Sequence, residues 1–84
     1  MDYIELKKRV LATQYFRLET YLIDGVQYVL EKGNAASPDH WMLWIFPIGQ
    51  FADFEAGDSI EEVFVKAEQR SVPVSKLTLD AWHS

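Results

Sequence analysis

The spacing of apolar side chains predicts a helix near the amino terminus. Asp2 and Glu5 have the spacing of a helix start. The apolar residues beside them fall within one broad arc of a 3.6-residue period: Tyr3, Ile4, Leu6, Val10 and Leu11. We therefore expect a helix over residues 2–12.

A second helical pattern begins at Ser59. Ser59 and Glu62 form a capping box, in which the serine accepts a backbone hydrogen bond at the helix start. Because Pro73 disfavours helical geometry in the residue before it, this helix should end near Ser71. Its apolar residues have the i, i+3, i+4, i+7 spacing of one helical face: Ile60, Val63, Phe64 and Ala67.

Between the two helices the pattern changes to that of β-strands. Alternating apolar and polar residues predict a strand over residues 14–22, and a second β-rich run follows over residues 26–31. Residues 41–46 are apolar on both faces, which predicts a strand covered on both sides. A tight turn would then let residues 50–54 fold back as a short fourth strand. Residues 74–82 fit either a short helix or an edge strand.

Two registers are open for the hairpin between the first two strands. A two-residue Asp24-Gly25 loop would place Leu22 beside Gln27 and mix apolar with polar groups on both faces. A three-residue loop that also includes Ile23 avoids this mixing. We predict the longer loop, because a one-residue slip moves every side chain to the opposite face. It aligns Leu22 with Val26, Thr20 with Tyr28 and Leu18 with Leu30.

These elements predict a single α+β domain over residues 1–84. We expect an antiparallel sheet of three or four strands, preceded by the N-terminal helix, with the second amphipathic helix packed on one sheet face. A chain of this length supports one modest core. The residues expected to share it are Phe16, Leu18, Leu22, Val26, Leu30, Leu43, Ile45, Val63 and Phe64.

Charge is concentrated in the middle of the chain. The net charge is −5, and residues 33–65 contain no lysine or arginine. An acidic surface attracts basic molecules and repels phosphate, so we expect a basic protein partner and no direct nucleic-acid binding. The alternative is that these acids are solvated helix-start and loop residues. The acids expected to face a partner are Asp53, Glu55, Asp58, Glu61 and Glu62.

Aromatic residues are more numerous than a core of this size can hide. The chain has three tryptophans, four tyrosines and five phenylalanines, and Tyr or Trp on a sheet face is a common binding anchor. The alternative is that this face is covered by the carboxy-terminal tail or by a second copy, as in a structural protein that assembles into a homodimer. The candidate anchors are Tyr15, Tyr21, Trp44 and Trp82.

Residues suited to catalysis or metal binding are sparse. The chain has no cysteine, and His40 and His83 lack the carboxylate spacing of a metal site. Asp53 and Glu55 could form the acid/base pair of a small hydrolase, although a chain this short leaves little room for a cleft. We therefore expect a non-enzymatic protein with no cofactor and no metal.

The start of the chain and its apolar runs predict a cytoplasmic location. The acidic first residues differ from the basic start of a secretory signal. The longest apolar run, residues 41–48, is shorter than the roughly 20 residues that a membrane helix needs. We therefore expect no association with a membrane.

Two segments resemble HicB-type antitoxins, in which a strand ends in Phe-Pro and a Gly-Asp-Thr-x-Glu-Glu-Ala helix start follows. Here Phe46-Pro47 is followed by Gly57-Asp58-Ser59-Ile60-Glu61-Glu62-Val63, with Ala67 further along. Where that family continues after Phe-Pro with Asp, Leu, Pro and Gly, this chain has Ile48 and Gly49. The resemblance implies a small regulatory, inhibitor-like protein that neutralises a basic RNA-cleaving toxin by covering its active site.

Overall fold

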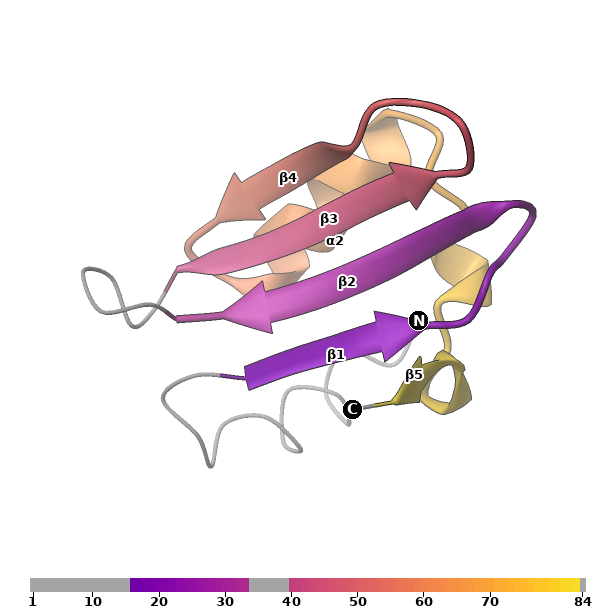
Figure 1. The fold of residues 1–84 in the computed structure, drawn as a ribbon. Coiled ribbons are helices and arrows are strands. Elements are labelled where there is room, and N and C mark those ends of the chain that lie inside the picture. Colours follow the sequence, from indigo (N-terminus) through magenta and orange to yellow (C-terminus); the bar gives the residue numbers. More distant parts are fainter. Residues whose placement is uncertain (1–15, 34–39, 84) are drawn as a thin grey trace.

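Five strands form one antiparallel sheet in the computed structural model, which describes residues 16–33 and 40–83. The strand order is β4-β3-β2-β1-β5. Helix α2 (Ile60–Gln69) crosses the sheet behind β3 and β4, and two short 3₁₀ helices lead from it to the last strand (Figure 1). The remaining bounds are β1 (Phe16–Thr20), β2 (Val26–Lys32), β3 (Trp41–Pro47), β4 (Asp53–Gly57), η1 (Val74–Lys76), η2 (Leu79–Ala81) and β5 (Trp82–His83).

The predicted fold class, a two-helix α+β domain, is wrong. The sheet has five strands rather than three or four, and α2 is the one α-helix in the described part of the chain. The helix predicted over residues 2–12 lies outside the described residues. The extra strand is β5, which follows η1 and η2 in the segment whose local pattern fitted helix or strand. Tertiary contact decides that segment, because Trp82 packs into the core.

The predicted start of α2 is confirmed. The Ser59 hydroxyl accepts the backbone N–H of Glu62 at 3.1 Å. The Glu62 carboxylate reaches back and accepts the N–H of Asp58 at 2.9 Å, one residue before the cap. A Cβ at Gly57 would lie 2.8 Å from that carboxylate, so the glycine makes room for the contact. The helix start therefore depends on Gly57 and Asp58 as well as on the capping box.

The end of α2 near Ser71 is also confirmed, through hydrogen bonds rather than through Pro73 alone. The N–H of Val72 donates to the Ala67 carbonyl at 3.0 Å, and that of Ser71 donates to Glu68 at 3.0 Å. This pair of bonds is the Schellman arrangement, whose left-handed position is usually a glycine. Ser71 occupies it with φ +71.

The predicted three-residue hairpin loop between β1 and β2 is wrong. Ile23 and Val26 exchange both backbone hydrogen bonds, at 2.8 and 3.1 Å, around a two-residue turn. The turn residues Asp24 and Gly25 both have positive φ, +53 and +80, which is typical of a type I′ turn. Such a turn matches the twist of the strands on either side. Turn geometry therefore selects the loop length.

A bulge at the end of β1 keeps the predicted strand pairing despite the shorter turn. Leu18 pairs with Leu30, as predicted. Between that pair and the turn, β1 contributes residues 19–22 and β2 contributes residues 27–29, so one residue more lies on the β1 side. Leu22 follows the bulge and is 58% exposed. Its predicted place in the core is therefore wrong.

The fourth strand begins later than predicted. Gln50 donates its N–H to the Pro47 carbonyl at 3.3 Å, and Gly49 between them has φ +73, so the expected tight turn is present. Pairing with β3 nevertheless resumes only at Asp53, opposite Ile45. The residues between turn and strand are exposed. Strand β4 is consequently Asp53–Gly57 rather than residues 50–54.

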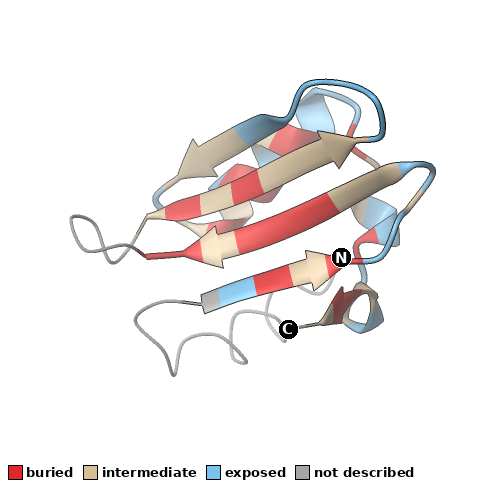
Figure 2. Ribbon diagram, viewed as in Figure 1, coloured by how far each residue is buried: buried red, intermediate tan, exposed pale blue. Residues whose placement is uncertain are grey.

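The core lies between the sheet and α2, with the C-terminal segment closing it beside β1. Figure 2 shows buried residues along the middle of β2 and β3 and on α2, whereas the turns are exposed. Of the residues expected there, Val26 and Ile45 pack against the core while partly buried, and the side chain of Phe16 is not described. The others except Leu22 are in the buried cluster: Leu18, Leu30, Leu43, Val63 and Phe64.

Candidate functional site

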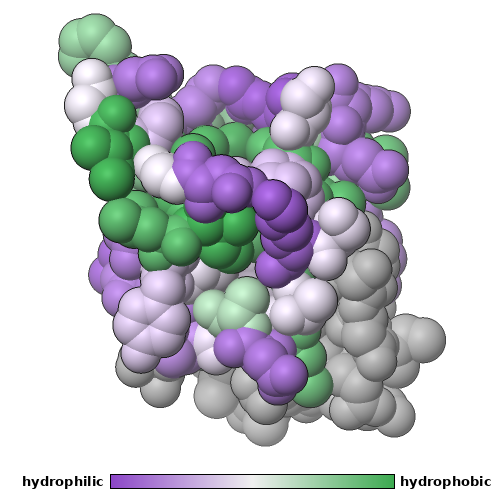
Figure 3. Space-filling model, turned by 90° about the vertical axis from the view of Figure 1, so that its right-hand side faces the viewer, coloured by the Kyte–Doolittle hydropathy of each residue, from purple (hydrophilic) through white to green (hydrophobic). Residues whose placement is uncertain are grey.

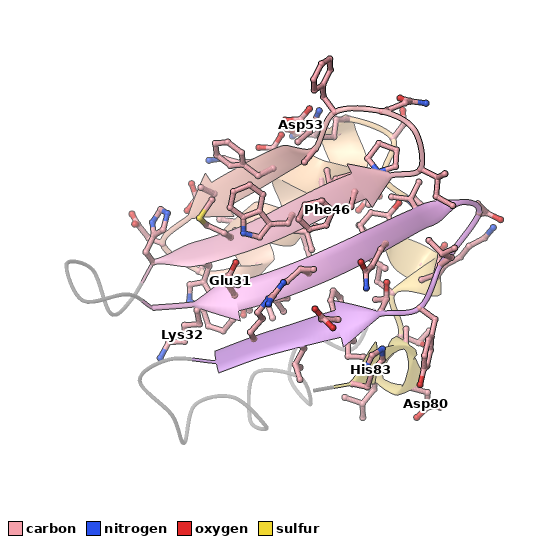
Figure 4. The ribbon with its side chains drawn as sticks, in the orientation of Figure 1. Glu31, Lys32, Phe46, Asp53, Asp80 and His83 are labelled. Carbon is pink, nitrogen blue, oxygen red and sulfur yellow. The ribbon has the colours of Figure 1, made fainter. Side chains whose placement is uncertain are left out.

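The face of the sheet opposite α2 is the candidate binding surface. Side chains of a strand alternate between the two faces, and α2 and the core occupy one of them. No described helix packs on the other, which we call the outer face. Figure 4 shows it toward the viewer, with Glu31 and Phe46 in front of the ribbon and α2 behind. Its residues are Arg17, Glu19, Gln27, Val29, Glu31, Met42, Trp44, Phe46, Phe54 and Ala56.

Three aromatic rings form a cluster on this face, at β3 and β4. The ring centroid of Trp44 lies 6.0 Å from that of Phe46 on the same strand, and these two rings are almost parallel. It lies 5.3 Å from the ring centroid of Phe54 on the neighbouring strand. Phe54 is exposed at the edge of the sheet. The indole N–H of Trp44 is buried and has no acceptor among the described residues. We call these three residues the aromatic cluster.

The β1 side of the outer face is polar. Arg17 forms an ion pair with Glu19 at 3.3 Å, and the side-chain amide of Gln27 donates to the Thr20 carbonyl at 3.2 Å. An apolar centre beside a polar rim is the usual composition of a protein-binding surface. The side chains of the outer face therefore have the composition of a surface that binds another protein.

Two of the predicted partner-binding acids form ion pairs with the C-cap residue of α2 instead. Arg70 forms ion pairs with Asp53 and with Glu55, the latter at 2.9 Å. The Arg70 hydrogen bond, followed by that from the Phe54 N–H, holds the pKa of Asp53 below its usual value. A general acid needs a raised pKa. The arrangement of Asp53 and Glu55 is thus that of an ion-pair network at the sheet edge rather than an acid/base pair.

The other three predicted acids surround the start of α2. Glu62 binds the Asp58 N–H and lies 3.2 Å from Lys66, and these contacts, in that order, lower its pKa. Glu61 lies beside it in the first turn, and Asp58 precedes the N-cap residue Ser59. Acids in a first helical turn complement the helix dipole. The structure therefore places these five acids on the α2 side of the sheet, whereas the aromatic cluster lies on the outer face.

The predicted aromatic anchors divide among three environments. Trp44 belongs to the outer face. Tyr21 is exposed and stacks on His83, with 4.3 Å between ring centroids. Trp82 is buried and meets Phe64 edge to face, at 6.4 Å, so its ring is part of the core. Tyr15 lies outside the described residues.

The structure shows an exposed apolar tip that the sequence patterns did not predict. It is defined by Leu22, Ile48 and Phe51 at the two turns, and Phe51 is 98% exposed. The Ile48 N–H donates to the Gly25 carbonyl at 3.1 Å, which ties the turns together. Figure 3 shows hydrophobic side chains gathered on this end of the molecule. The signal in the sequence is the absence of any charged residue from position 41 to position 52.

The described residues contain no group of three or more metal-ligating side chains. Among the same residues, no helix has the length and hydrophobicity needed to cross a membrane. Comparison of the chain with protein-family models, with curated proteins and with solved structures finds no match. The resemblance to HicB-type antitoxins therefore stays a prediction. Its residues lie at the end of β3, at the end of β4 and along α2.

Proposed function

We propose that the protein is a non-enzymatic binding domain that recognises a basic protein partner with the aromatic cluster of its outer face. One observation carries the proposal: the rings of Trp44, Phe46 and Phe54 meet on a face that no described helix covers. Aromatic anchors of this kind dominate the affinity of many interfaces.

The charge distribution supports a basic rather than an acidic partner. Arg17, Lys66, Arg70 and Lys76 each form an ion pair with an acid of the chain, and Lys32 lies over the ring of Trp41. These are the lysines and arginines of the described residues. The excess acids therefore set the sign of the field around the domain, as the net charge of −5 indicates.

Such a surface fits a protein that inhibits its partner by covering the partner's active site, as the resemblance to HicB-type antitoxins implies. An inhibitor needs a preformed face and no chemistry of its own. The cytoplasmic location stays a prediction.

A second candidate function is homo-oligomerisation through the same face, in a structural or assembly role. Two apolar sheet faces pack well on each other, and Phe54 leaves the edge of the cluster exposed. Light scattering separates the two proposals, because a dimer has twice the mass of the chain.

The test is to isolate the partner from the native host and measure its affinity by calorimetry at two salt concentrations. Phe46→Ser with Phe54→Ser should weaken binding by roughly tenfold or more, as expected for hot-spot residues. Phe51→Ser is the matched control, because it removes an exposed aromatic ring outside the cluster. Unchanged affinity in the cluster variant, or equal losses in both variants, would contradict the proposed site.

A further inference from the structure

The edge of β4 is closed by the side chains of Lys66 in α2 and of Arg70, the C-cap residue of α2. β4 pairs with β3 on one side and ends the sheet on the other. Along the edge of β4 that points away from β3, the Lys66 ammonium donates to the Ala56 carbonyl at 2.9 Å. Arg70 donates to the Phe54 carbonyl on the same edge at 3.4 Å. The Phe54 N–H donates to the Asp53 carboxylate at 2.8 Å. These are the backbone groups that an added strand would bind.

The direction of the backbone groups shows which residues of β4 an added strand could hydrogen-bond to. A residue in an antiparallel strand points its N–H and C=O to the same side. The Ala56 N–H therefore lies on the edge together with the Ala56 carbonyl. A strand laid along β4 would hydrogen-bond to Phe54 and Ala56, and it would have to displace Lys66 and Arg70 from their carbonyls.

We propose that the β4 edge is a closed strand-addition site, which opens for an extended partner segment that alternates basic and apolar residues. This inference does not depend on the aromatic cluster being the main binding surface.

The basic residues of the partner follow from the acids on the α2 side of β4. Asp53 and Glu55 point to that side, and Arg70 neutralises both. A strand that displaces Arg70 leaves these two carboxylates without a cation unless it supplies one at the facing position. The ion pairs are exposed, with 35% of the Arg70 side chain accessible, and exposed pairs contribute little to stability. Exchange of one cation for another is therefore feasible.

The apolar residues of the partner segment are inferred from the side chains on the other side of β4. Phe54 and Ala56 belong to the outer face, and Phe54 is 48% exposed at its edge. Side chains of the added strand on that side would extend the apolar surface beside Phe54.

Pairing of β4 with β4 of a second copy is disfavoured by charge. In the antiparallel register in which Phe54 faces Ala56 of the other copy, Glu55 would face the same glutamate. Like charges directly opposite each other destabilise a strand pair. The edge therefore selects a basic partner strand over self-association.

The test uses a blocked octapeptide of alternating valine and lysine as the probe, measured by fluorescence anisotropy. Lys66→Met with Arg70→Met removes the donors but keeps apolar side chains. This variant should bind the probe roughly tenfold more tightly than the natural protein, because the edge carbonyls no longer need to be uncovered. Arg17→Met with Lys76→Met changes the net charge equally at sites away from β4 and should leave the affinity near that of the natural protein.

Backbone pairing is tested by adding Ala56→Pro to the Lys66→Met, Arg70→Met variant. Proline removes the outward N–H without breaking a bond to β3, and edge strands tolerate it. It should return the affinity to the level of the natural protein. A peptide of alternating valine and glutamate, and one with its four valines and four lysines in two blocks, should bind weakly or not at all.

If the double variant does not fold, as judged by circular dichroism, the natural protein is titrated with the probe by NMR. The amide of Ala56 should then shift more than those of β1. Equal binding by the natural protein and the double variant, an unchanged affinity with Ala56→Pro, or largest shifts away from β4 would each overturn the proposal.

Discussion

The backbone N–H of Tyr28 donates to the side-chain hydroxyl of Thr20, over 3.0 Å, inside the β1–β2 sheet. Thr20 is fully buried. It stands at the start of the bulge, where the ladder of backbone hydrogen bonds is interrupted. Its hydroxyl therefore takes the place of a strand carbonyl and satisfies a donor that water cannot reach.

Thr20→Val should lower the free energy of unfolding by about 1–3 kcal/mol, because valine has the shape of threonine but leaves the Tyr28 N–H unsatisfied. Urea denaturation measures the change. Thr20→Ser keeps the hydroxyl and should cost less than Thr20→Val. A valine variant as stable as the natural protein would show that the hydroxyl is not needed at the bulge.

Ser71→Gly should raise the free energy of unfolding by about 0.5–1 kcal/mol. Ser71 has φ +71 at the end of α2, where a residue with a Cβ is strained and glycine is not. Thermal and urea unfolding would detect the gain. Ser75→Gly, at an exposed position in η1, is the control and should give no gain. A loss of stability in Ser71→Gly would mean that the serine side chain makes a contribution larger than the strain.

Phe64→Ala should lower the free energy of unfolding by about 3–5 kcal/mol, since the ring is fully buried between α2 and the sheet. A chain of this length has roughly 4–13 kcal/mol in total, so the loss is between about a quarter and the whole of its stability. Val65→Ala, at the next and exposed position of α2, should change stability by at most about 0.5 kcal/mol. Similar losses at both positions would contradict the observed orientation of the helix.

Acid should destabilise the protein through Asp53 and Glu62. Folding lowers the pKa of each carboxyl below its ordinary value, 3.8 for Asp53 and 4.5 for Glu62. The stabilisation is therefore complete above those ordinary values and is lost as the pH falls through the lower pKa values of the folded state. Urea midpoints measured across this range at low salt should fall toward acid pH.

Arg70→Met tests the source of the acid sensitivity, because the Arg70 hydrogen bond is the largest cause of the lowered Asp53 pKa. The decline at acid pH should be shallower in this variant. Both carboxyls are exposed, so high salt should also reduce it. An equal decline in the variant and the natural protein would assign the acid sensitivity to other groups.

The local sequence was sufficient for the elements whose signals are close together in the chain. The capping box placed the start of α2 at Ser59, because an N-cap needs only residues within one turn. Apolar alternation placed Leu18 opposite Leu30, because both must face the core. The aromatic excess also indicated aromatic side chains on the sheet face away from the helix, and Trp44 lies on that face, which no described helix covers.

Local patterns could not show which cations reach which acids. Asp53 and Glu55 are separated from Arg70 in the chain by a turn and the whole of α2, and only the crossing of the helix behind β4 brings them together. The acidic middle of the sequence therefore looked like an open surface, whereas Arg70 and Lys66 neutralise part of it.

The sequence by itself determined the first three strands, the capped helix and the main core residues, because hydrophobic period and capping are properties of neighbouring positions. The tertiary structure decided the two-residue turn, the bulge that keeps Leu18 opposite Leu30, and the fifth strand. The physical reason is that a sheet satisfies turn geometry and side-chain burial together. After Thr20 the register set by the turn differs by one residue from the register set by side-chain burial, and a bulge accommodates the extra residue. The position of the bulge is evident only from the paired strands.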